Sequence, residues 1–259
     1  MPIVTLLEKA HDFSSLKSLD IVLEPFFKGL KVNFKIHGRA IQEWIQVEIT
    51  GEDEAVALQL LDREIGLTPT HGDKVGKFSF LRGKIVNSRK ALSEINVDVG
   101  VFTPKVVYAN VSLQRLQAQL ADGKHLSLQN LAELYCLYDD MPFQVKIVDS
   151  DLSSKKRYFE AELSEQQLSL FSSWLRASLD RLIVLGARFG DVEYAIRASK
   201  HFRDVVKIQS MGLLEHAVVC KLGTDAVGLI PEIARYLRTA NFAPFSPKRI
   251  LRIIDRSTL

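Results

Sequence analysis

The stretch Lys77-Phe78-Ser79-Phe80-Leu81-Arg82-Gly83-Lys84-Ile85-Val86 decides the fold that we predict for the centre of this chain. Alternate side chains of a β-strand share one face, so Phe78, Phe80 and Arg82 should project together. Further strand-like segments follow at residues 94–101 and 106–113, separated by polar or turn residues. Short strands in succession with such punctuation predict a small β-barrel or meander.

Basic and aromatic side chains alternate along this central segment. Between residues 68 and 110 there are seven basic and three acidic residues, a local charge of +4 against +3 for the whole chain. Barrels that bind single-stranded nucleic acid combine cations along the phosphates with rings that stack on bases. The alternative is that these rings fill the barrel core. The nucleic-acid-binding residues that we predict here are Lys74, Lys77, Phe78, Phe80, Arg82, Lys84, Arg89, Lys90, Phe102, Lys105 and Tyr108.

The central segments also resemble a known barrel. Residues 77–86, 95–100 and 107–113 are similar to the OB barrel repeated in the largest bacterial small-subunit ribosomal protein, and Val97-Asp98-Val99-Gly100 is the most suggestive piece. The resemblance implies an RNA-binding barrel. The helix and final strands of such a barrel are not apparent after Leu113.

The flanking regions have a different pattern. Residues 3–66 and residues from 182 onward both predict the order strand, helix, strand, strand, helix. We therefore predict an α+β fold in which two such modules flank a central OB-like β-barrel. The predicted parts are an N-terminal α+β module (residues 1–67), an OB-like barrel with a helical extension (68–163) and a C-terminal α+β module with a basic tail (164–259).

The run from Lys221 to Pro231 contains a glycine-bracketed loop before a helix. Free N–H groups there could hold a phosphate, which makes Lys221, Gly223, Thr224 and Gly228 a possible phosphate loop. The favoured alternative is a tight turn in which the glycines supply unusual backbone angles and Asp225 caps the helix.

The C-terminal part contains the runs DRLIVLGA at residues 180–187 and LLEHAVVCKLGTDAVGLIP at residues 213–231. On the basis of these runs, the whole chain resembles an uncharacterised archaeal family, the domain of unknown function numbered 2110. The resemblance implies an archaeal origin. It implies no activity, because the family has none known.

The C-terminal end is strongly basic. From residue 235 onward six basic residues face one acid, a local charge of +5. Charge is therefore segregated along the chain, and we add Lys248, Arg249 and Arg252 to the predicted nucleic-acid-binding residues.

Several chemistries find little support in the residues. Cys136 and Cys220 have no CxxC or CxxH spacing, so neither a disulfide framework nor a structural zinc site is expected. His216 and Cys220 could form a nucleophile and base, but a buried, unreactive thiol is favoured. No apolar run has the length of a membrane span. We expect a cytoplasmic protein with no metal, no cofactor and no membrane partner.

The leading functional prediction is a non-enzymatic factor that binds RNA, or single-stranded DNA, as an accessory in translation or transcription. The runner-up is a protein-interaction scaffold on a ribosome, another ribonucleoprotein or an RNA polymerase, which an exposed apolar surface around Trp44 would support. The third is an enzyme acting on a phosphorylated substrate at the loop after Lys221. The oligomeric state does not follow from the sequence.

Overall fold

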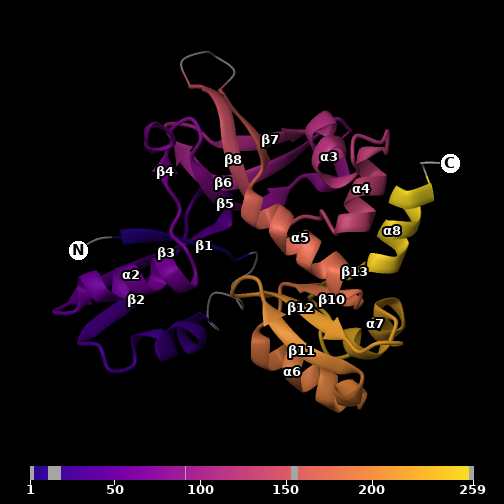
Figure 1. Ribbon diagram of the computed structural model, residues 1–259. Coiled ribbons are helices and arrows are strands. Elements are labelled where there is room, and N and C mark those ends of the chain that lie inside the picture. Colours follow the sequence, from indigo (N-terminus) through magenta and orange to yellow (C-terminus); the bar gives the residue numbers. More distant parts are fainter. Residues whose placement is uncertain (1–2, 11–18, 91, 153–156, 257–259) are drawn as a thin grey trace. The chain divides into compact units, whose positions relative to one another are not determined.

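The computed structural model describes residues 3–10, 19–90, 92–152 and 157–256 (Figure 1). The chain forms two compact units: the first combines residues 1–76 with 99–107, and the second combines residues 77–98 with 108–259. The fold is mixed α+β with a closed five-stranded β-barrel, sheets and helices, so the predicted fold class is confirmed at this level.

The first unit contains a three-stranded antiparallel sheet in the order β1 (Ile3–Lys9), β3 (Trp44–Gly51), β2 (Val32–Arg39). Helix α2 (Glu54–Glu64) packs on β3, whose side chains Ile45, Val47 and Ile49 are fully buried. Helical residues 19–23 give way to the 3-10 turn Glu24–Phe27, because Pro25 has no N–H to continue an α-helix. The short strand β4 (Thr70–His71) pairs in parallel with the end of β6 that lies in this unit.

The barrel lies mainly in the second unit. Its strands are β5 (Phe80–Val86), β6 (Glu94–Thr103), β7 (Val107–Ser112), β8 (Pro142–Asp151) and β9 (Tyr158–Leu163). They follow the order β6-β5-β8-β9-β7, and pairing of β7 with β6 closes the barrel. The β7–β9 pair is parallel, whereas β5–β6, β5–β8 and β8–β9 are antiparallel. Alternate residues such as Phe143, Val145, Ile147, Phe159 and Ala161 are fully buried or nearly so and form the barrel core.

The structure shows the second half of the barrel, which was not apparent from the sequence after Leu113. Helices α3 (Leu113–Leu120) and α4 (Leu128–Tyr135) follow β7, and β8 and β9 then complete the barrel. Both helices begin at serine caps: the backbone N–H of Arg115 donates to Ser112 and that of Asn130 donates to Ser127. Gly83 lies where β5 and β6 approach closely, since a Cβ there would come within 2.3 Å of the Asp98 carbonyl oxygen.

The C-terminal part of the second unit is a four-stranded antiparallel sheet in the order β11-β12-β10-β13. Its strands are β10 (Arg181–Leu185), β11 (Val205–Ser210), β12 (Glu215–Cys220) and β13 (Asn241–Phe245). Helices α6 (Phe189–Ala198) and α7 (Ala226–Ala234) cover one face, where Leu182, Val184 and Val218 join their apolar side chains. The first three strands pair in the same relative order as β1, β2 and β3 of the first unit.

Helix α5 (Glu165–Ala177) covers the other face of this sheet (Figure 1). Four rings meet there: Tyr135 of α4, Phe171 and Trp174 of α5, and Phe245 of β13. Phe171 and Phe245 stack at 6.3 Å with an interplanar angle of 8°, and Trp174 meets Phe245 edge-on at 5.0 Å. This aromatic cluster joins the barrel's helical segment to the sheet. Helix α8 (Pro247–Arg256) then packs beside α5.

Two residues differ from what their types favour. Glycine is common at turns, but Gly38 lies within β2 at a shift in the pairing with β3. The glycine-bracketed loop was predicted to precede its helix, but α7 already begins at Ala226, which places both Gly228 and Pro231 inside it.

A buried ion pair links the barrel to the C-terminal sheet within the second unit. The Lys84 ammonium lies 2.7 Å from Oε1 of Glu215, and both side chains are almost wholly buried. Lys84 shares the outward face of β5 with Phe80 and Arg82, but β12 covers this end of the strand. Burying two charges is favourable only when each remains compensated by the other.

We expect Lys84→Met to lower the free energy of unfolding by about 3–5 kcal/mol, because it leaves the Glu215 carboxylate buried without its cation. The double variant Lys84→Met/Glu215→Leu should recover most of that loss, since neither charge then remains. Urea unfolding followed by circular dichroism measures both. Equal losses in the single and double variants would contradict this account of the pair.

Candidate nucleic-acid interface

Two phenylalanine rings stand exposed at the start of β5. Phe78 is 59% exposed and Phe80 is 57% exposed, whereas Phe143 and Phe159 of the same barrel are buried. Most large apolar side chains of a small barrel are needed in its core. Two neighbouring rings on the surface therefore form a contact surface that the core does not require.

A β-bulge turns Phe78 outward. The N–H of Phe78 donates to the carbonyl of Ile147 at 2.8 Å, and the N–H of Ile147 donates to the carbonyl of Ser79 at 2.9 Å. Two residues thus oppose one, and Phe78 adopts a φ of +68°. A bulky residue in this left-handed region is uncommon and carries backbone strain. Bulges of this kind redirect side chains, and here the ring points to solvent.

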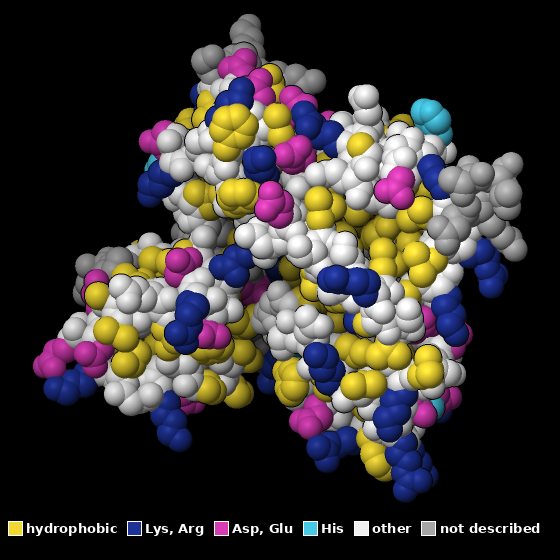
Figure 2. Space-filling view, viewed as in Figure 1, with side chains coloured by type: hydrophobic (Ala, Val, Ile, Leu, Met, Phe, Trp, Pro, Cys, Tyr) yellow, Lys and Arg dark blue, Asp and Glu magenta, His cyan; other side chains and the backbone are white. Residues whose placement is uncertain are grey.

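Cations surround the rings. The Nζ atoms of Lys77 and Lys146 each lie 5.7 Å from the centroid of the Phe78 ring. Phe80 lies opposite Lys146 in the β5–β8 register, and Arg82 is exposed on the same face of β5. We call Lys77, Phe78, Phe80, Arg82 and Lys146 the aromatic patch. Figure 2 shows hydrophobic side chains intermixed with charged ones over this part of the second unit.

Carboxylates partly neutralise the aromatic patch. Lys77 lies 3.5 Å from Asp149, and Lys146 lies 3.4 Å from Glu162. These contacts are long and solvent-accessible, so each stabilises the fold little and can be exchanged for another anion.

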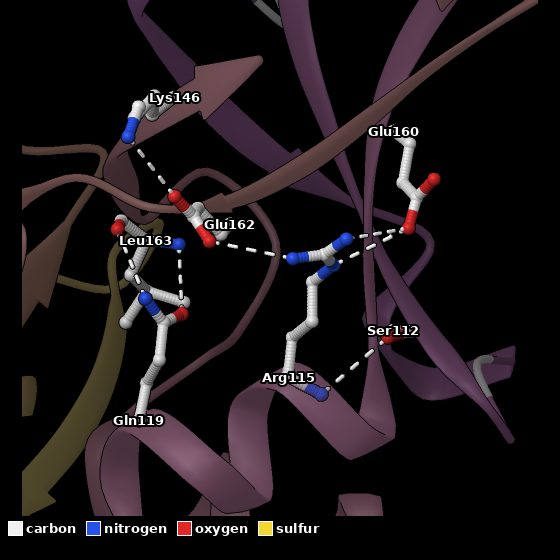
Figure 3. A network of polar contacts seen from close by, with 7 residues as sticks. All are labelled: Ser112, Arg115, Gln119, Lys146, Glu160, Glu162 and Leu163. Atoms are coloured by element: carbon white, nitrogen blue, oxygen red, sulfur yellow. Dashed lines mark hydrogen bonds and ion pairs between the residues drawn. The ribbon is translucent and has the colours of Figure 1, made fainter. Parts of the chain in front are cut away.

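A polar network fixes the edge of the aromatic patch (Figure 3). Arg115 of α3 donates to Glu160 at 2.8 Å and to Glu162 at 3.3 Å, so Glu162 lies between Arg115 and Lys146. Gln119 of the same helix donates to the Leu163 carbonyl at 3.2 Å and accepts from the Leu163 N–H at 2.9 Å. These contacts hold α3 against β9 and thereby position the carboxylate that Lys146 faces.

The other predicted central residues do not join the aromatic patch. Lys84 is buried against Glu215, which removes it from any surface. Lys74, Phe102 and Lys105 belong to the first unit. Tyr108 is half-buried, and burial, assisted by Asp98, raises its pKa. Arg89 lines a separate hollow of 460 Å³ beside α4, and the side chain of Lys90 lies outside the described residues.

The possible phosphate loop has the geometry of a capped turn. Gly223 has a φ of +91°, and Asp225 accepts from the Val227 N–H at 3.1 Å, which occupies the start of α7. Lys221 and Thr224 line a hollow of 230 Å³ together with Lys248. Asp180 and Asp225 line the same hollow, and these two acids oppose the binding of an anion.

The basic C-terminal residues lie on α8. Arg249 pairs with Glu133 of α4 at 3.2 Å, while Lys248 and Arg252 are exposed. The aromatic patch, by contrast, gains Lys146, which the sequence analysis missed. The alternation of buried Val145 and Ile147 around it could have indicated an outward lysine on a barrel strand.

The geometry of the described residues does not support nucleophilic catalysis by the cysteines or the binding of a metal ion. Burial raises the pKa of the Cys220 thiol to about 12, so little reactive thiolate forms at neutral pH. His216 contacts the carbonyl oxygen of Ala187 through Nε2 at 3.0 Å. Within the described part of the chain, no group of three or more His, Cys, Asp or Glu side chains is placed to hold a metal ion. Nor does any described helix have both the length and the apolar character for a membrane span.

The C-terminal sheet carries the clearest similarity to known proteins. Residues 179–244 match the DUF2110 C-terminal domain. The match runs from just before β10 to Pro244, near the end of β13, and it includes both runs on which the resemblance to this family rested. It supports a relation to a family of unknown function. The archaeal origin stays a prediction.

Comparisons with other proteins add little. No curated protein matches the sequence. A crystal structure of a protein from Thermus thermophilus aligns with 98% of this chain at 12% identity, with a TM-score of 0.15. The aligned region spans 42% of that protein, and so low a TM-score carries no structural argument.

Substitutions at Phe78 distinguish the contribution of its ring to stability from that of its strained backbone. We expect Phe78→Gly to leave the free energy of unfolding unchanged or to raise it by up to about 1 kcal/mol, because glycine adopts a positive φ freely and the lost ring is exposed. Phe78→Ala keeps the strain and should be the less stable of the two. Thermal unfolding ranks the variants, and a large loss in both would mean that the ring belongs to the core.

The two cysteines should be inert in the folded protein. Burial raises the pKa of Cys136 and Cys220 from 9.0 to about 12, so neither should react with Ellman's reagent at pH 8 until the chain is unfolded. Above pH 9 the unfolded chain loses thiol protons that the folded chain retains, so stability should fall between pH 9 and 12. Fast labelling of the native protein would refute this.

Proposed function

We propose that the protein binds single-stranded RNA through the aromatic patch, without catalysing a reaction, as an accessory factor in translation or transcription. The observation that carries the proposal is the pair of exposed rings, Phe78 and Phe80, flanked by Lys77, Arg82 and Lys146. Flat rings accept unpaired bases by stacking, and cations beside them neutralise the linking phosphates.

The barrel topology supports this proposal. In chain order its strands pair first with second, second with third, third with fifth, fifth with fourth and fourth with first, and helices lie between the third and fourth. We propose on this basis that it is a barrel of the OB type, which binds oligonucleotides in many proteins. The aromatic patch lies on the first and fourth strands, β5 and β8, rather than on the second and third that such barrels commonly use.

The local charges predict a moderate affinity. A phosphate that approaches Lys77 or Lys146 replaces Asp149 or Glu162 as the anionic partner. The net gain per phosphate is therefore smaller than for a cation without a neighbouring acid. Stacking contributes roughly 1–3 kcal/mol per base and does not depend on these exchanges.

Two alternatives to RNA binding are a protein-interaction scaffold and a protein that binds single-stranded DNA. The scaffold hypothesis was to be supported by an exposed apolar surface around Trp44, but that ring is fully buried and the Lys9 ammonium lies 4.7 Å from its centroid. Single-stranded DNA, like RNA, offers unpaired bases for stacking and linking phosphates. We also propose that the protein binds its RNA on a ribosome or an RNA polymerase.

Fluorescence anisotropy with a labelled single-stranded RNA tests the proposal. An RNA of about 12 nucleotides is suitable, because this length is within the site size of one such barrel. We expect Phe80→Ala to weaken binding roughly 5- to 150-fold, the equivalent of about 1–3 kcal/mol for one stacked base. Phe202→Ala is the matched control, because Phe202 is also 57% exposed but lies on the C-terminal sheet domain. Lys77→Ala and Lys146→Ala should each reduce the magnitude of the slope of log affinity against log salt by less than about 0.7, because each lysine already faces a carboxylate.

The same assay separates the alternatives. A DNA strand of equal sequence distinguishes RNA from single-stranded DNA, and a duplex should bind more weakly because its bases are already stacked. An RNA affinity that is unchanged by Phe78→Gly, by Phe80→Ala and by salt concentration would overturn the proposal.

A further inference from the structure

Strand β11 forms an edge of the C-terminal sheet. Within the described residues it pairs with β12 on one side and with no other strand. Val206, Lys207 and Ser210 on it are exposed. An edge strand with exposed side chains presents main-chain N–H and C=O groups that a further strand can pair with.

An apolar groove runs along this edge between β11 and helix α6. It encloses 660 Å³, and its apolar lining includes Phe189 and Ile196 of α6, Phe202 of the following turn, and Val206 and Ile208 of β11. Phe189, Phe202 and Val206 are about half exposed, at 45%, 57% and 53%. Figure 2 shows hydrophobic side chains over α6 and β11, with Lys and Arg side chains around them.

Local structure creates this groove. Val192, Ala195 and Ile196 bury one side of α6 against the sheet, which leaves Phe189, Glu193 and Arg197 along the side that faces β11. A register shift between Val205 and Lys207 in the pairing with β12 turns Val206 outward. The Phe189 ring meets the His216 ring edge-on at 5.7 Å, which supports one end of the groove.

The charge around the groove is one-sided. Glu193 is paired with Arg197 at 2.9 Å and Asp191 with Arg188 at 2.7 Å, while Asp204 contacts the His201 ring at 2.8 Å, which compensates its charge only when the imidazole is protonated. No described carboxylate forms an ion pair with Lys200, Arg203 or Lys207. The edge therefore offers uncompensated positive charge beside apolar side chains.

We propose that this groove binds an extended, acidic segment of a partner protein, which adds to β11 as a further strand. Alternate apolar side chains of the segment would enter the groove, while its main chain pairs with the edge and its carboxylates face Lys200, Arg203 and Lys207. A second copy of this chain fits less well, because symmetric pairing of two β11 strands would bring the same cations together. RNA has no main chain that repeats an N–H donor and a C=O acceptor at the spacing of a β-strand, so it fits this edge less well than a peptide strand does.

The test selects peptides that bind the full chain from a phage-displayed library of random peptides. Each peptide is about 12 residues long, which spans an added strand with flanking residues. Counter-selection against the double variant Phe202→Ala/Lys207→Glu removes peptides that bind elsewhere, and the far-ultraviolet circular dichroism and thermal unfolding of this variant should match those of the parent. We expect enriched peptides with apolar residues at alternate positions and with Asp or Glu between them. No enrichment over the double variant, or enrichment of basic sequences, would overturn the proposal.

Anisotropy of a labelled enriched peptide completes the test. Phe202→Ala and Lys207→Glu should each weaken binding at least about fivefold, whereas Phe80→Ala should not change it. Of the two alternating sets of backbone nitrogens in the peptide, an added strand donates only one set to the edge, so methylation of that set should abolish binding and methylation of the other should not; unchanged binding in both methylated peptides would exclude strand addition. Loss of RNA affinity in Phe202→Ala would identify RNA as the occupant, and a dimer in sedimentation that this variant dissociates would identify a second copy.

Discussion

The buried pair of Lys84 and Glu215 is the contact on which the second unit depends. It joins an outward-facing position of the barrel strand β5 to the first residue of β12, at 2.7 Å and almost without solvent. Either charge alone would be very unfavourable there, so as long as both charged groups are present the two side chains must meet. A hydrophobic contact would tolerate sliding of the two parts. A buried ion pair at hydrogen-bond distance does not, because a small displacement lengthens the contact through which the two charges compensate each other.

This constraint also determines which part of β5 is available for binding. Phe80, Arg82 and Lys84 follow one another on the same face, yet only the first two reach solvent. The aromatic cluster around Phe171 and Phe245 has a similar effect on the C-terminal sheet, since it covers the face opposite α6 and α7. All residues of β10 and β12 are buried as a result. Neither face of that sheet is an open platform, and its accessible features lie at the edge formed by β11.

The sequence was sufficient to predict features that depend on neighbours in the chain. Alternation and turn residues predicted the central strands at residues 77–86 and 94–101. It could not show that Lys84 differs from Arg82, because burial by β12 comes from a residue 131 positions away. The second half of the barrel was not apparent for a related reason: two helices separate β7 from β8 along the chain, so the pairing of β8 with β5 and of β9 with β7 is not local in sequence.

Phe78 illustrates the limit most clearly. Alternation placed it on one face with Phe80 and Arg82, but the bulge opposite Ile147 is what turns its ring to solvent, and no residue in the sequence marks that bulge. The local charge of +4 suggested that phosphate neutralisation would dominate RNA binding. In the folded chain Lys84 is lost to Glu215, and Lys77 and Lys146 each face a carboxylate. The cations that remain therefore release few counterions, and the proposed affinity must come mainly from stacking on Phe78 and Phe80.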